Sequence, residues 1–293
     1  MAPNAFAYAS GRTGRLIEVT DGFYFVTLAF SSLFHRFIDD FRAFLGSVLV
    51  TREKEFLPPL ESLKRMEDLG DEFFARWSPP DTEAELLEIL GSVSHSPVRL
   101  GEVPALVGTE GIGYAEAAMR FAMGHELGHH LLDYVDARGG ERVDLQPVLA
   151  EWIEHGMLRV PELDPGPAAE LDADLFAMML VLLDLERATS DSLGRWGKTL
   201  QAAAGGAVAL AALSVVGGRE REGPARCLGT GDRSHPPFEV RMEQLIDVVG
   251  KAGHPHPDGD LFMPEIGREV SRHPVSFILQ FWACRSLVAA VSG

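Results

Sequence analysis

The sequence predicts a mainly helical fold of the α+β class, with a small β-hairpin at its N-terminus. Across residues 23–49, apolar side chains that include Phe37, Phe41 and Phe44 recur every three or four residues, which is the spacing of a helix with one buried face. Two short runs around a glycine-containing turn predict a hairpin over 4–20. The aromatic side chains of the first helix are therefore expected in the core.

Helical spacing predicts most of the remaining chain. Asp81 follows a proline pair and is a favourable N-cap for a helix. Stretches rich in glycine and proline at 94–113 and 217–237 separate other helices as loops. These further helices are expected over 60–77, 81–93, 114–135, 145–157, 168–187, 200–218, 238–251 and 273–291.

The net charge and the cysteine content of the chain indicate which partners and which cellular compartment to expect. The chain has 43 acidic and 26 basic residues and a formal charge of −17, which repels phosphate backbones and anionic membranes and excludes a nucleic-acid partner. Two cysteines, Cys227 and Cys284, cannot build a disulfide framework or a zinc knuckle, so a reducing cytoplasm is expected. The first residues lack the pattern of a secretion signal.

One apolar run raises the question of a membrane. Residues 200–218 carry no charge over a length close to that of a transmembrane helix. The run is rich in alanine and glycine, and a closely packed core helix accounts for that composition. A second run beginning at Val275 is interrupted by Arg285, which is costly inside a bilayer. We therefore favour a protein outside the membrane and keep a membrane-embedded processing enzyme as an alternative.

The strongest chemical motif is His125-Glu126-Leu127-Gly128-His129, within the helix predicted over 114–135. Residues four apart on a helix share a face, so His125 and His129 can bind one Zn²⁺ ion. Glu126 lies beside them as a candidate general base.

A catalytic zinc usually has three protein ligands, and the best third ligand is Glu170. Asp174 follows four residues later on the same helical face and can accept a hydrogen bond from the second ring nitrogen of His125, which fixes the ring. The alternative is that these acids form a solvated helix start. We favour the metal site because a complementary pair of helices is present. Asp172 falls on a different face and is expected on the surface.

Short blocks elsewhere resemble the minigluzincin peptidases, which include the HtpX-type and CAAX prenyl proteases. Asn4-Ala5-Phe6-Ala7 resembles their first strand, and Ser234-His235-Pro236-Pro237 with Arg241 resembles a later His-Pro segment and its following arginine. Arg120-Phe121 and the run from Glu170 to Ala177 are also similar to the ImmA/IrrE-type proteases.

The resemblance implies a zincin-like helical core in a single metallopeptidase domain over 1–293. It implies a sheet edge at Asn4, Ala5 and Phe6 to which a peptide substrate adds as a strand. Residues 23–112 depart from the compact members as a long helical insertion, which is similar to the Lit-type phage-exclusion proteases.

The same resemblance brings His235 and Arg241 to the cleft, where a donor to the developing oxyanion is needed. For His235 the alternative is a tight turn at Pro236-Pro237. Among the other histidines, His130 points away from His129 and is interpreted as structural. The pair Glu151 and His155 is interpreted as surface.

These observations lead to one main functional expectation, a zinc-dependent endopeptidase in which Glu126 activates water. A protein or peptide is the expected substrate, and the long insertion is compatible with a regulatory protein partner. The alternative is a catalytically silent zinc-binding sensor on the same fold. An intact Glu126 favours the peptidase, because metal binding alone requires only His125, His129 and Glu170.

Overall fold

The computed structural model describes residues 5–10, 14–51, 68–70, 72–73, 75–77, 81–92, 107–109, 111–136, 167–188, 192–220, 236–251, 263, 266, 268, 270 and 274–292. This part of the chain is mainly helical, as the sequence predicts. Outside it lie the helix expected over 145–157, most of the one expected over 60–77, Asn4 and His235. Residues 221–235 of the loop expected over 217–237 also lie outside it, whereas 217–220 are helical instead.

The predicted hairpin is present at the N-terminus. Strand β1 (Ala5–Ser10) pairs antiparallel with β2 (Gly14–Val19), and the register joins Ala5 to Val19 and Ser10 to Gly14. Thr20 follows β2 directly and caps the first helix, because its hydroxyl accepts a hydrogen bond of 3.2 Å from the backbone N–H of Phe23.

Helix α1 (Asp21–Thr51) carries the aromatic stripe into the core. Phe37 and Phe41 are fully buried. Phe37 packs edge-to-face against Trp77, at a ring-centroid distance of 5.1 Å, and Trp77 donates a hydrogen bond of 3.1 Å to Asp40. This long helix is therefore a core element of the fold.

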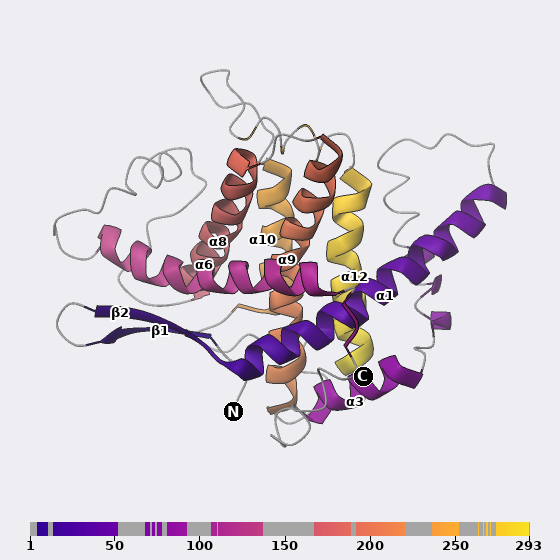
Figure 1. The fold of residues 1–293 in the computed structure, drawn as a ribbon, viewed down its shortest axis with the longest axis horizontal. Helices are drawn as coiled ribbons and strands as arrows, with labels where there is room; N and C mark the ends of the chain where they lie inside the picture. Colours follow the sequence, from indigo (N-terminus) through magenta and orange to yellow (C-terminus); the bar gives the residue numbers. More distant parts are fainter. Residues whose placement is uncertain are drawn as a thin grey trace.

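Six further helices complete the described fold: α3 (Asp81–Ser92), α6 (Ile112–Asp136), α8 (Pro167–Ala188), α9 (Ser192–Glu220), α10 (Phe238–Lys251) and α12 (Pro274–Ser292). Helices α8, α9, α10 and α12 stand side by side, and α6 runs across them with α1 and the hairpin close by (Figure 1). The hairpin contacts α6 through both of its strands.

Helix α9 lies at the centre and contacts α6, α12, α1, α8, α10 and α3. Glycine permits its close approach to α6, since a Cβ atom at Gly205 would lie 2.6 Å from the backbone of Ala117. Within the described residues, Trp196–Val215 is the one helical stretch long and apolar enough to cross a membrane, and 78% of its most apolar window is buried inside the fold. A central core helix meets the same criterion.

A second close crossing joins α6 and α8. Gly124 and Gly128, four residues apart on α6, face Ala177 and Ala173 of α8. A Cβ atom at Gly128 would lie 3.1 Å from the Cα of Ala173, so a larger residue would press the helices apart. This crossing brings the first turn of α8 beside the middle of α6.

Candidate metal centre

Two helices supply the three candidate ligands that the sequence predicts. His125 and His129 project from α6, and Glu170 projects from the first turn of α8. The Nε2 atoms of the two histidines are 3.0 Å apart, and each lies 3.3 Å from an oxygen of Glu170. A tetrahedral zinc with bonds of about 2.0–2.1 Å has ligand atoms about 3.3–3.4 Å apart. The two separations of 3.3 Å match this value and the histidine separation is slightly shorter, so the three side chains are close enough to bind one metal ion.

The ligands differ in exposure. The side chains of His125 and Glu170 are 11% and 14% exposed, whereas that of His129 is 28% exposed. Burial lowers the pKa of His125, but hydrogen bonds with Asp174 and Glu170 outweigh this effect and raise the pKa to about 9. Burial raises the pKa of Glu170, but hydrogen bonds with both histidines outweigh it and lower the pKa. The site thus holds its acid ionised.

Behind His125 lies the hydrogen bond that the four-residue spacing predicts. The Nδ1 atom of His125 is 2.8 Å from Oδ1 of Asp174, whose side chain is fully buried. The carboxylate accepts the proton of Nδ1, so Nε2 is the nitrogen that faces the other candidate ligands and offers its lone pair once its own proton has left.

Helix α10 holds this arrangement from the far side of Asp174. Arg241 donates hydrogen bonds of 2.6 and 2.7 Å from Nε and Nη2 to the two oxygens of Asp174. Three residues later, Gln244 donates a bond of 2.6 Å to the carbonyl of Leu171. Burial raises the pKa of Asp174, but the Arg241 charge outweighs it and keeps the pKa low. Arg241, Asp174 and His125 therefore form one connected chain.

Glu126 lies next to the first ligand and is 9% exposed. Burial lowers the pKa of Arg241, but the charges of Asp174, Glu170 and Glu126 outweigh it and raise the pKa. The carboxylate of Glu126 is thus close enough to the centre to act on Arg241 electrostatically. No hydrogen bond or ion pair to Glu126 is formed within the described residues.

The other residues predicted for the site have mixed outcomes. Arg241 is at the centre, with two of its N–H groups bound to Asp174 and Nη2 4.0 Å from Glu170. Ala5 and Phe6 belong to β1, whose backbone alone is described. Asn4 and His235 lie outside the described residues.

Two features were not anticipated from the sequence. His130 does have a structural role, but a specific one, because its Nε2–H donates a hydrogen bond of 3.0 Å to the carbonyl of Leu16 and so ties β2 to α6. The expectation that Asp172 lies on the surface was wrong, since this residue is 1% exposed. Helix α8 contacts α6, α9 and α10, so more than one of its faces is buried.

Comparison with protein-family models, curated proteins and solved structures found no match. The geometry of the centre therefore carries the functional argument.

Proposed function

We propose that this protein is a zinc-dependent endopeptidase. The observation that carries the proposal is the close approach of the two histidine nitrogens, 3.0 Å apart, to the Glu170 carboxylate. Each nitrogen lies 3.3 Å from a different oxygen of Glu170, and Glu126 follows His125 directly in the sequence. A metallopeptidase site requires three metal ligands and an acid that serves as general base. Here two helices supply the ligands, and Glu126 directly follows the first of them.

The chemistry divides between metal and protein. A zinc ion held by His125, His129 and Glu170 lowers the pKa of water and polarises a carbonyl group. Glu126 accepts a proton from the attacking water and delivers it to the amine that leaves when the peptide bond breaks. General acid–base catalysis of this kind contributes about 10²–10⁴-fold in rate.

Asp174 and Arg241 are positioning residues in this proposal. Asp174 fixes the orientation of His125, and Arg241 neutralises Asp174 so that a carboxylate can remain ionised in a fully buried position. A buried and satisfied network of this kind keeps a ligand in place before the metal arrives.

The hairpin is the proposed site for the substrate backbone. It contacts α6 and is tied to the residue after His129 by the hydrogen bond from His130 to Leu16. Within the described chain β1 pairs only with β2, so a peptide can add to its other edge as a strand. Backbone hydrogen bonds then give affinity that tolerates many sequences.

A first experiment tests the metal site by substitution of the third ligand. Elemental analysis should find about one zinc per chain in the wild type and far less in Glu170→Gln. Asp184→Asn is a matched control, because Asp184 is also an acid of α8 but its side chain is 73% exposed. Full zinc occupancy in Glu170→Gln would show that another residue is the third ligand.

A second measurement concerns the reaction. A search of cell-extract proteins for newly formed N-termini should find cleavage by wild type and Asp184→Asn, and none by Glu170→Gln. Zinc binding by a wild type that produces no new termini in any extract fraction would favour the zinc-binding sensor.

A further inference from the structure

A cavity of about 550 Å³ lies on the other flank of the α6–α8 crossing from the metal centre. One face of α6 forms its floor, and residues of α8, α9 and β2 form its walls. It shares no residue with the candidate metal centre. Its volume falls within the range of about 300–1,000 Å³ that is typical of small-molecule sites.

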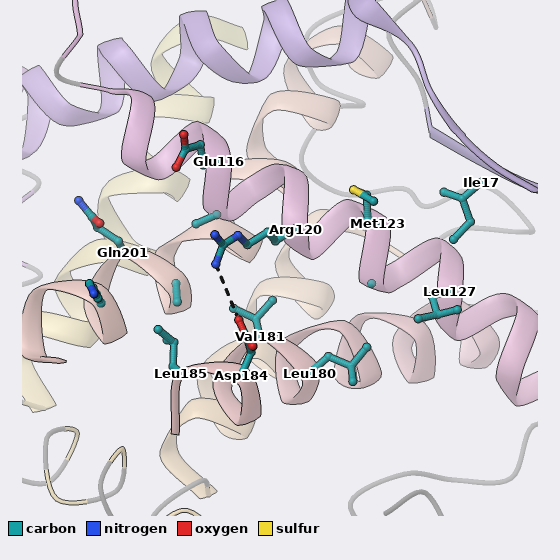
Figure 2. A pocket seen from close by; sticks show the side chains of 14 residues that line it. Ile17, Glu116, Arg120, Met123, Leu127, Leu180, Val181, Asp184, Leu185 and Gln201 are labelled. Carbon is teal, nitrogen blue, oxygen red and sulfur yellow. Dashed lines mark ion pairs between the residues drawn. The ribbon is translucent and has the colours of Figure 1, made fainter. Parts of the chain in front are cut away.

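The lining of this cavity is polarised along α6. Its end beside the hairpin is apolar and contains Ile17, Met123, Leu127 and Leu180 (Figure 2). Met123 is 52% exposed, which is unusual for a large apolar side chain beside other apolar groups. Methionine adapts its shape readily and is common at binding surfaces. This end is suited to an alkyl chain.

The opposite end carries charges of both signs. Glu116 and Asp184 are acidic, and Arg120 and Lys198 are basic. Arg120 and Asp184 approach each other at 3.9 Å, but their side chains are 65% and 73% exposed, so the pair is weak and can exchange partners (Figure 2). Glu116 and Lys198 form no ion pair within the described part of the chain. A ligand head group with a single charge would be repelled by the two lining residues of the same sign. A zwitterionic head group can place each of its charges beside a residue of opposite sign.

We propose that this cavity binds a zwitterionic amphiphile, with one alkyl chain beside Met123 and a head group between Glu116 and Lys198. The proposal does not depend on peptidase activity, because the cavity and the metal centre lie on different flanks of the crossing.

The test uses four probes with the same eight-carbon chain and different head groups, each below its micelle-forming concentration. Octylphosphocholine is zwitterionic, octanoate is anionic, octyltrimethylammonium is cationic and octyl glucoside is neutral. Calorimetric titration of the full chain should give one saturable site with the tightest binding for octylphosphocholine. Each exposed ion pair contributes up to roughly fivefold in affinity. Equal affinity for all four probes, or binding that does not saturate, would overturn the proposal.

Charge-specific variants separate the two ends of the head group. Lys198→Gln should weaken octylphosphocholine and octanoate binding but leave octyltrimethylammonium binding in place. Glu116→Gln should weaken octylphosphocholine and octyltrimethylammonium but spare octanoate. If neither variant changes the relative affinities for the four probes, the proposed head-group site is wrong.

Met123→Glu tests the apolar end and should abolish binding of every probe. Tyr24→Glu is its control, since Tyr24 is also a large exposed side chain, 39% exposed, but lies on α1 and does not line the cavity. Unchanged binding in Met123→Glu would contradict the proposal. Glu170→Gln should lose zinc yet still bind octylphosphocholine, which distinguishes failure of this site from failure of the metal centre.

Discussion

Arg241 binds Asp174 through two hydrogen bonds of 2.6 and 2.7 Å, although the two residues are 67 positions apart in the sequence. The Asp174 carboxylate is fully buried and also contacts Nδ1 of His125 at 2.8 Å. One guanidinium on α10 thus compensates the buried charge that orients a candidate metal ligand on α6. The stability of the fold and the geometry of the centre are linked at this point.

Removing the Arg241 charge should destabilise the protein strongly. Arg241→Gln leaves the Asp174 carboxylate buried without its cation, and breaking a buried ion pair in this way typically costs about 3–5 kcal/mol. Urea unfolding of the zinc-free protein measures the effect. Arg42→Gln is the control, because its pair with Asp39 is about half exposed, at 44% and 51%, and should cost less than about 1 kcal/mol. Similar losses in both variants would show that burial of the pair contributes nothing.

Asp174→Asn should weaken zinc binding while the three ligands remain. The amide cannot accept both the histidine proton and the two Arg241 bonds, so His125 loses its fixed orientation. Loss of such a partner usually costs about 10–100-fold in metal affinity. Competition with a chelator measures the zinc dissociation constant. An unchanged constant would remove Asp174 from the account.

Gly128→Ala tests the helix crossing without touching a ligand. The new Cβ would lie 3.1 Å from the Cα of Ala173, and backbone cannot rotate away, so α8 must shift and carry Glu170 with it. We expect zinc affinity to fall although alanine favours a helix by up to about 1 kcal/mol. Gly197→Ala is the matched control, since no atom outside its own stretch of helix lies within 4 Å of its Cβ position. This control should gain stability and retain zinc, whereas equal zinc affinity in both variants would contradict the packing argument.

The stability of zinc-free protein should depend on pH through His125. Its pKa is raised from 6.5 to about 9 by Asp174 and Glu170, against the lowering effect of burial. The stabilisation is therefore complete below pH 6.5 and is lost as pH rises through about 9. The free energy of unfolding should fall over this interval by at most about 3 kcal/mol. Zinc-loaded protein should not show this fall, because the metal takes the place of the proton. A flat profile for the zinc-free protein would contradict the contacts of His125.

Local patterns made several features predictable. The bounds of α10 and nearly those of α3 follow from caps, prolines and apolar spacing, which act within a few residues. The alignment of His125 with His129 follows from helical periodicity alone. The prediction of Glu170 as third ligand assumed only that its helix meets the helix of the two histidines. In the structure its two oxygens lie 3.3 Å from His125 and His129.

Contacts between segments far apart in the sequence were harder to predict. Spacing along α8 cannot reveal that Arg241 of α10 reaches Asp174, and the resemblance placed Arg241 only near the cleft. Asp172 was misplaced because a helix with neighbours on three sides has no single buried face. Gly124 and Gly128 offered a usable signal, since glycines four residues apart on a helix mark a close crossing. No local sequence pattern predicts the hydrogen bond from His130 to the carbonyl of Leu16, because the two residues are far apart in the chain.

The most direct test of the proposed peptidase is Glu126→Gln. This change keeps the shape of the side chain and all three ligands but removes the carboxylate that accepts the proton of water. Zinc content should remain near one per chain, while cleavage of a substrate found with the wild type should fall by at least about 10²–10⁴-fold. Glu116→Gln, at a glutamate ten residues before Glu126 on α6 and outside the three-ligand cluster, is the control and should cleave like the wild type. Cleavage at the wild-type rate by zinc-loaded Glu126→Gln would contradict the account.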